Sequence, residues 1–329
     1  MKVHIFNGDD VSDTKEMMEI WREEFAGNPE IEYEFKGRFS PKDPDRCLGD
    51  ADAVLGAFIV DGYFSDELLE RYPNLKYVST FAHGFGKIDA DAARKHNVTF
   101  TNTIYGDYTI AQYTFAMLLD ICHNIRAQDA LYKKRLTEHI PAGPENRLAS
   151  KQIGLCGKTL GIIGVGNIGY RLAKMAEAFG MNVIAYDIVK KTEEKYRFIR
   201  QVDMDELLKS SDVISIHCAL TDDTRNLLDS GAFNRMKDGV IILNAARGAI
   251  IDEEALAAAL RSGKVYMAGL DVVAGEPLTE RIPLMDCDNA IITAHIAWLQ
   301  DDVWRRTIRL AASNFKNWLS GRPVSVIAP

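Results

Sequence analysis

The sequence has few basic residues for its size, and it lacks long apolar runs. Its 329 residues include 39 Lys and Arg against 47 Asp and Glu, which gives a net charge of -8. Nucleic-acid binding needs clustered positive charge, so this balance argues against it. Residues 1–10 contain no apolar region long enough for a signal peptide, and no stretch reaches the roughly 18 apolar residues of a membrane span. We therefore expect a cytoplasmic protein that binds neither nucleic acid nor membrane.

The sequence also lacks paired cysteines. Its five cysteines show no CxxC spacing, and their odd number argues against a disulfide framework or a zinc site. Reduced thiols, as in a cytoplasmic protein, are the simpler interpretation. We expect no bound metal.

Short apolar runs alternate with helical patterns along most of the chain. Strands are expected at residues 3–6, 53–59, 75–79, 159–163, 182–186, 213–216, 240–243, 266–272 and 290–293. Helices are expected at residues 13–25, 104–125, 167–179, 204–209, 253–262 and 301–319. This alternation predicts α/β architecture, with parallel sheets covered by helices on both faces.

The length and the pattern together predict two domains. A chain of 329 residues suffices for two domains of about 150 residues each. Residues 103–296 are expected to form one doubly wound unit. The amphipathic helix at residues 301–319 cannot bury its apolar face alone, so we expect it to pack back on an N-terminal domain. The prediction is two doubly wound, Rossmann- or flavodoxin-like domains with a cleft between them. The first domain consists of residues 1–102 plus 297–329, and the second consists of residues 103–296.

One polar stretch, residues 128–152, interrupts the pattern. It contains Pro141, Gly143 and Pro144, and it is too long for an ordinary connection. Either an arm that reaches a partner subunit or a mobile loop would explain it.

A glycine-rich turn, Gly164-Val165-Gly166-Asn167-Ile168-Gly169, joins the strand expected at residues 159–163 to the helix that follows. Gly164 permits a tight turn, Gly166 lets the backbone approach a pyrophosphate, and Gly169 lets the helix pack closely on the sheet. The free N–H groups of the helix, including those of Asn167 and Ile168, attract anions. The segment predicts a dinucleotide site.

An acidic residue, Asp187, ends the next expected strand, 18 residues beyond Gly169. A carboxylate there accepts hydrogen bonds from the ribose hydroxyls of NAD and repels the additional phosphate of NADP. The predicted cofactor is therefore NAD. Lys190 and Lys191 either soften the exclusion of NADP or lie as solvated charges on the surface.

Residues able to carry out chemistry follow three later strands. Arg247 comes after the strand at 240–243, Glu276 after that at 266–272, and His295 after that at 290–293. Ligands bind at the carboxyl ends of strands in open α/β sheets. An Arg can hold a carboxylate and polarise a carbonyl, a His can exchange a proton, and a Glu beside it favours its charged form. With a hydride carrier alongside, the three residues predict an oxidoreductase.

These segments resemble the D-isomer-specific 2-hydroxyacid dehydrogenases. The shared landmarks, over nearly the whole chain, are Asn244-Ala245-Ala246-Arg247-Gly248, Leu270-Asp271-Val272, Glu276-Pro277 and His295-Ile296. The resemblance implies that Arg247 binds the substrate carboxylate and carbonyl. It also implies that His295, paired with Glu276, is the general acid in reduction and the general base in oxidation.

Further contacts follow from the same resemblance. It implies that Asp271 contacts the nicotinamide amide and that His217, Cys218 and Ala245 line the cofactor site. Residues 103–296 would then be the NAD-binding Rossmann domain, and the remaining residues would be the substrate domain. Residues 79–86 are similar to the family's substrate loop, so the expected substrate contacts are Ala82, His83, Gly84 and, after the last strand, Trp298. His83 either touches the substrate or faces solvent.

Within the family, His295-Ile296-Ala297-Trp298 and Ala111-Gln112 are most similar to the glycerate dehydrogenase/hydroxypyruvate reductase branch. Ala219 and Ala294 depart from it, since prolines are usual at both positions. The resemblance implies interconversion of a D-2-hydroxy acid and its 2-keto acid, with hydroxypyruvate or glyoxylate reduction first, and it implies a homodimer. D-lactate, phosphoglycerate or another oxyacid is the alternative substrate. An NAD-sensing corepressor is the alternative of another class.

Overall fold

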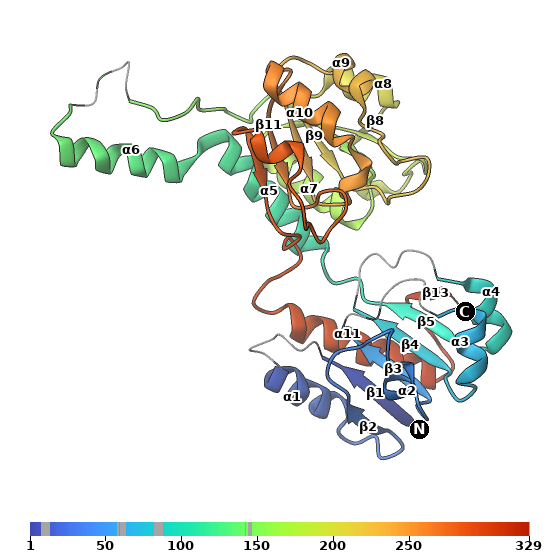
Figure 1. The fold of residues 1–329 in the computed structure, drawn as a ribbon. Helices are drawn as coiled ribbons and strands as arrows, with labels where there is room; N and C mark the ends of the chain where they lie inside the picture. The colour runs from blue at the N-terminus through green and yellow to red at the C-terminus, as the bar shows by residue number, and fades with distance from the viewer. Residues whose placement is uncertain are drawn as a thin grey trace. The chain divides into compact units, whose positions relative to one another are not determined.

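The structure, a computed structural model, describes residues 1–7, 14–57, 59, 64–81, 88–141, 143 and 147–328. The chain divides into two compact units, unit 1 (Met1–Gly106 with Gln300–Pro329) and unit 2 (Asp107–Leu299). Each unit is built on a mainly parallel sheet (Figure 1), so the predicted α/β class with two parallel-sheet domains is confirmed. Among the helices of the described residues, none combines the length and apolar character needed to cross a bilayer.

In unit 1, the residues that the structure describes form a six-stranded sheet in the order β13-β5-β4-β3-β1-β2. The strands are β1 (Lys2–Phe6), β2 (Glu32–Phe35), β3 (Ala53–Gly56), β4 (Tyr77–Thr80), β5 (Thr99–Asn102) and β13 (Val326–Ala328). The first five are parallel, and β13 runs antiparallel to β5. The strand order reverses between β1 and β3, which is where such sheets bind ligands.

Helices cover both faces of the sheet in unit 1. They are α1 (Thr14–Phe25), α2 (Pro44–Cys47), α3 (Asp66–Arg71), α4 (Ala90–His96) and α11 (Val303–Leu319). Ile308 and Phe315 of α11 share one buried cluster with Trp21 of α1 and Tyr77 of β4. The C-terminal helix thus buries its apolar stripe against the N-terminal strands, as its amphipathic pattern required.

The part of unit 2 that is described forms a seven-stranded sheet in the order β12-β11-β10-β9-β6-β7-β8. The strands are β6 (Thr159–Ile163), β7 (Asn182–Tyr186), β8 (Arg200–Gln201), β9 (Val213–Ile216), β10 (Val240–Asn244), β11 (Val265–Leu270) and β12 (Ala290–Ile292). All neighbouring pairs are parallel. The order reverses between β6 and β9, which makes this a Rossmann-type sheet with its ligand edge at the ends of those strands.

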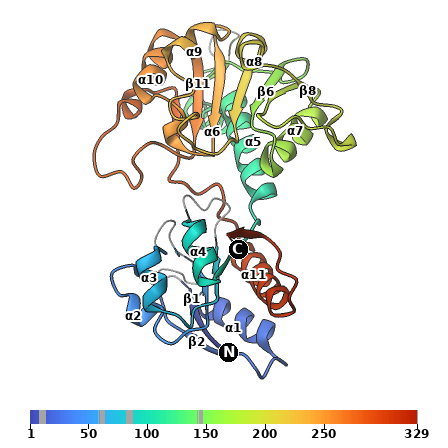
Figure 2. The ribbon, with the colours of Figure 1, turned by 90° about the vertical axis from the view of Figure 1, so that its right-hand side faces the viewer.

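The described residues of unit 2 form six α-helices: α5 (Asp107–His123), α6 (Ile125–Glu138), α7 (Asn167–Ala178), α8 (Met204–Ser210), α9 (Ser230–Arg235) and α10 (Glu253–Ser262). Residues of α5 and α7 pack with Leu160 and Ile162 on one face of the sheet. Residues of α8, α9 and α10 pack with Ile163 and Ile242 on the other (Figure 2). Both faces are buried, which explains why these strands read as continuous apolar runs.

The segment after α5 corrects the sequence prediction. The helix expected at 104–125 ends at His123, and a mobile loop over the whole of 128–152 is wrong for its first part, because α6 runs to Glu138. An arm that reaches a partner subunit stays a prediction. Asn124, with a φ of 42°, separates the helices, and its side chain accepts a hydrogen bond from Ala127 N at 3.2 Å. Most residues of α6 are Ala, Gln, Leu, Lys or Arg, which are good helix formers. The helix was not predicted because the segment is polar and has no clear apolar stripe.

Candidate functional site

The glycine turn between β6 and α7 has no room for side chains at two of its three glycines. Gly164 has a φ of 93°, and a Cβ there would lie 2.7 Å from the backbone nitrogen of Cys218. A Cβ on Gly169 would lie 2.4 Å from the carbonyl oxygen of Gly164. Gly166 differs, because it is exposed and a Cβ there would meet nothing within 4 Å. The open space over Gly166 fits a ligand that approaches the backbone closely.

The start of α7 favours a negatively charged ligand. Gly166 is its N-cap and supplies no side-chain hydrogen bond, and its first turn has no acidic residue. The first N–H groups of this 12-residue helix are thus not capped by a side chain of the N-cap residue. These N–H groups, together with the positive end of the helix dipole, can bind a pyrophosphate.

Asp187, at the end of β7, is tied to the glycine turn. Its Oδ2 accepts a hydrogen bond from Val165 N at 2.7 Å, and its Oδ1 accepts one from Val189 N at 2.8 Å. The Nζ of Lys191 lies 3.5 Å from the same Oδ2, and the Lys191 side chain is only 20% exposed. Lys191 is therefore a partner of the Asp187 carboxylate and not a freely solvated surface charge.

The loops after β11 and β12 meet through Glu276 and His295. Nδ1 of His295 lies 2.8 Å from Oε2 of Glu276, and the other oxygen, Oε1, accepts a hydrogen bond from Val273 N at 2.6 Å. One carboxylate oxygen is thus fixed by the backbone and the other by the imidazole. The His295 side chain is 45% exposed, so its ring is accessible to a small ligand. This pairing leaves Nε2 as the nitrogen that can meet a ligand.

Arg247 follows β10 on a turn shaped by Asn244. The buried Asn244 side chain accepts a hydrogen bond from Ala246 N and donates one to the Arg247 carbonyl, both at 3.0 Å. The exposed Arg247 guanidinium donates to the Ala246 carbonyl at 2.7 Å. Across the described part of the chain, no hydrogen bond or ion pair connects it to Glu276 or His295.

The backbone beside Arg247 nevertheless touches the Glu276 loop. A Cβ on Gly248 would lie 1.9 Å from the carbonyl carbon of Val273. The loops after β10 and β11 therefore pack backbone to backbone at Val273, the residue whose N–H holds Glu276.

Asp271, at the end of β11, is buried, and its carboxylate is occupied within the protein. Oδ1 accepts hydrogen bonds from Thr293 Oγ1 at 2.6 Å and from Ile296 N at 2.9 Å, and Oδ2 accepts one from Ala297 N at 2.8 Å. These partners all belong to the loop that carries His295. This arrangement could not be predicted from the sequence, because a contact between residues 271 and 293–297 produces no local pattern.

His217 and Cys218 lie beside the glycine turn, since their backbone approaches Gly164. Nε2 of His217 lies 2.8 Å from Ser215 Oγ. Burial lowers the pKa of His217 to about 4 and raises the pKa of Cys218 to about 11. Both groups are uncharged near neutral pH, which fits a lining role and not proton exchange.

Some of the other residues expected to contact the substrate or the cofactor are described by the structure, and some are not. Trp298 is half-buried, and its Nε1 donates a hydrogen bond to the His295 carbonyl at 2.8 Å. Ala245 is half-buried beside Arg247. Ala82, His83 and Gly84 lie outside the described residues. Among the residues that are described, no group of three or more His, Cys, Asp or Glu side chains could hold a metal ion.

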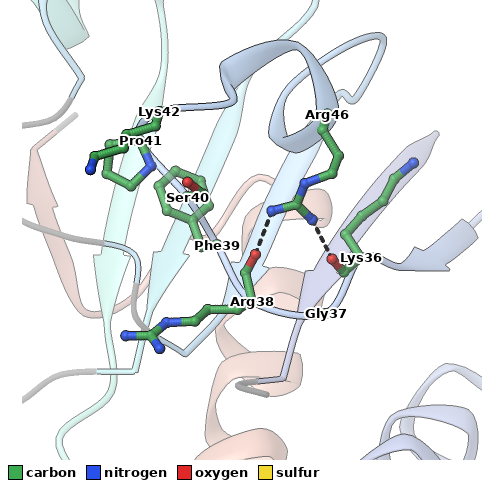
Figure 3. A pocket seen from close by; sticks show the side chains of 8 residues that line it. All are labelled: Lys36, Gly37, Arg38, Phe39, Ser40, Pro41, Lys42 and Arg46. Atoms are coloured by element: carbon green, nitrogen blue, oxygen red, sulfur yellow. Dashed lines mark hydrogen bonds between the residues drawn. The ribbon is translucent and has the colours of Figure 1, made fainter.

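Unit 1 contains a pocket of about 620 Å³, lined by residues 36–42 and Arg46, which was not predicted from the sequence. Figure 3 shows that Lys36, Arg38 and Lys42 point in different directions. Arg46 turns inward and donates hydrogen bonds to the carbonyls of Lys36 and Arg38 at 2.5 and 2.7 Å. The four bases within eleven residues, in a chain of net charge -8, were the signal available in the sequence.

Comparison with known proteins identifies the architecture. The model of the D-isomer specific 2-hydroxyacid dehydrogenase NAD binding domain matches residues 115–297, more than half of the chain. The chain belongs to the D-isomer-specific 2-hydroxyacid dehydrogenase family. The resemblance found in the sequence is thereby confirmed, and so are the expected reaction class and NAD as the cofactor.

Relatives of this dehydrogenase support the assignment. A hydroxypyruvate reductase from Blautia hydrogenotrophica is 38% identical over 85% of this chain and 86% of its own length. A glyoxylate reductase from Thermococcus litoralis is 34% identical, with 88% of each chain covered. The crystal structure of a glyoxylate reductase from Paecilomyes thermophila matches with a TM-score of 0.78 at 27% identity, covering 99% of this chain and 98% of that one.

The Asp187–Lys191 contact predicts how the dehydrogenase selects its cofactor. Asp187→Ala should lower the preference for NADH over NADPH by about tenfold or more, the equivalent of ~1.4 kcal/mol, because the carboxylate no longer repels the additional phosphate. Lys191→Met should raise the preference, because it removes the cation next to that position. Fluorescence titration of each variant with NADH and NADPH measures both effects. An unchanged affinity ratio in Asp187→Ala would assign the selection to other residues.

Proposed function

We propose that this dehydrogenase reduces hydroxypyruvate or glyoxylate to D-glycerate or glycolate. The observation that carries the proposal is the 2.8 Å contact between His295 Nδ1 and Glu276 Oε2 at the strand ends of the NAD-binding unit. The hydroxypyruvate and glyoxylate reductases among the relatives support this choice of substrate.

The proposed roles follow from the contacts of each side chain. His295, with Nδ1 on Glu276, presents Nε2 to the substrate oxygen, donating a proton in reduction and taking it back in oxidation. Glu276, anchored by Val273 N, stabilises the charged imidazole. Arg247, whose guanidinium bonds only to a neighbouring carbonyl within the described part of the chain, would turn to bind the substrate carboxylate through its two-pronged fork.

The residues proposed to hold NAD surround the glycine turn. They are Gly164, Gly166, Asn167, Ile168, Gly169, Asp187, His217, Cys218 and Ala245, and a contact from Asp271 to the nicotinamide amide is the alternative role that is tested below. When bound, the reduced cofactor NADH would supply the hydride for reduction, and NAD would accept it in oxidation. We assign substrate binding to a domain of residues 1–102 plus 297–329, with contacts from Ala82, His83, Gly84 and Trp298, and NAD binding to residues 103–296.

The test is NADH oxidation by the purified protein with a panel of 2-keto acids. The panel holds hydroxypyruvate, glyoxylate, pyruvate, a branched 2-keto acid and phosphohydroxypyruvate. The proposal predicts the highest kcat/KM for hydroxypyruvate or glyoxylate. A tenfold preference for pyruvate would transfer the assignment to D-lactate. A preference for the phosphorylated acid would implicate the basic pocket around Arg46.

We also propose that the protein is a cytoplasmic homodimer that associates through α6. Ile125, Tyr132 and Leu136 are 70%, 60% and 59% exposed, and their spacing of seven and four residues places them on one helix face. α6 extends away from the rest of its unit (Figure 1), so a second copy of this chain would bury that face. The cytoplasmic part of the proposal is supported by the five cysteines, which are all free, as is usual in a reducing compartment. Light scattering on Tyr132→Asp against wild type tests the dimer.

A further inference from the structure

The loop that carries His295 has an unusual backbone. His295 has a φ of 56°, in the left-handed region that side chains other than glycine adopt at a cost of about 1–2 kcal/mol. Surrounding contacts must therefore impose this conformation. Two loop residues that flank His295, Thr293 and Ile296, bond to the same carboxylate.

Asp271 supplies that carboxylate and holds the loop on both sides of His295. Its carbonyl oxygen accepts a hydrogen bond from His295 N at 2.8 Å. Its carboxylate accepts from Thr293 Oγ1 before the histidine and from Ile296 N and Ala297 N after it, at 2.6, 2.9 and 2.8 Å. Four bonds from one residue thus bracket the turn at His295.

Asp271 is itself held rigidly. It is 1% exposed, and its own N–H donates to the Asn244 carbonyl of the neighbouring strand at 2.9 Å. An amide cannot take over these three contacts, because its NH₂ group would face a backbone N–H or the Thr293 hydroxyl. Such charge-assisted bonds are stronger than neutral ones.

We infer that Asp271 is a positioning residue, whose carboxylate keeps His295 in the left-handed conformation and thereby aims its Nδ1 at Glu276. This inference rests on the proposed role of His295. It assigns to Asp271 a task apart from a contact with the nicotinamide amide. The two tasks make different predictions, because a cofactor contact acts on NADH affinity and a positioning contact acts on proton transfer.

The main test is Asp271→Asn, a substitution that keeps the shape of the side chain. We expect kcat to fall by about 10²-fold, the cost of misplacing a reacting group by about 1 Å. The Kd for NADH, from fluorescence titration, should stay within threefold of wild type. The pH at which kcat/KM is half-maximal should move, because the Glu276 contact is weakened. A Kd raised tenfold or more with the pH profile unchanged would overturn the inference in favour of the nicotinamide contact.

Thr293→Val provides a milder variant that keeps the carboxylate and removes one donor. We expect about a fivefold loss of kcat, in line with one hydrogen bond, with thermal stability close to that of wild type. If Asp271→Asn does not fold, this variant still decides the question. Full activity together with an unchanged pH profile in Thr293→Val would contradict the inference.

A readout independent of turnover separates this inference from the proposed function. The His295 ring signal in an NMR spectrum of histidine-labelled protein is assigned by its loss in His295→Ala. Its titration should change in Asp271→Asn whether or not His295 is the catalytic acid. An unchanged titration would overturn the positioning role, whereas full activity of His295→Ala would overturn only the proposed function.

Discussion

His295→Ala is expected to lower kcat by about 10²–10⁴-fold, the usual contribution of a positioned acid or base. The Kd for NADH should change by less than threefold, because the glycine turn and Asp187 belong to other strand ends. Steady-state kinetics and fluorescence titration measure the two quantities.

His139→Ala is the matched control for this variant. His139 is exposed and lies just after α6, and its ring bonds only to the Leu136 carbonyl, at 3.1 Å, among the described residues. It should keep wild-type kinetics. Weakened NADH binding with unchanged kcat in His295→Ala would mean that the imidazole serves the cofactor and not the proton.

Gly248→Ala is expected to damage both stability and activity. The new Cβ would lie 1.9 Å from the Val273 carbonyl carbon and 2.2 Å from its oxygen, and backbone atoms cannot rotate away. Overpacking of this kind costs about 1–3 kcal/mol of unfolding free energy. Because Val273 N holds Glu276, the shift also displaces the His295 partner, and we expect kcat/KM to fall by about 10²-fold.

Urea denaturation and steady-state kinetics measure these losses, with Gly154→Ala as the control. A Cβ on Gly154 would meet nothing within 4 Å, so that variant should match wild type. Wild-type stability and kcat/KM in Gly248→Ala would show that the two loops do not depend on each other.

Local patterns were sufficient to predict the framework of unit 2. The strands at 159–163, 182–186 and 213–216 were predicted at the bounds the structure gives, because buried parallel strands are unbroken apolar runs. The glycine turn was predictable because the tight turn and the close helix packing act within six residues. β2, β5 and β13 in unit 1 were missed, since short runs flanked by polar residues give weak patterns.

Contacts between distant residues could not be read from the sequence. The bonds from Asp271 to residues 293–297 and the approach of Gly248 to Val273 join separate strand ends. The ion pair of Lys191 with Asp187 could not be predicted from their spacing, because it depends on the conformation of the turn after β7. The glycine turn and the residue types at strand ends predicted which side chains matter, and only the fold explains how they are held.

The most direct test of the central claim, that one imidazole paired with Glu276 moves the proton in both directions, is the pH dependence of kcat/KM for reduction and for oxidation. The account predicts that reduction declines as pH rises and oxidation declines as pH falls, each with a midpoint that disappears in His295→Ala. Profiles that run in parallel, or a midpoint that survives in His295→Ala, would contradict it.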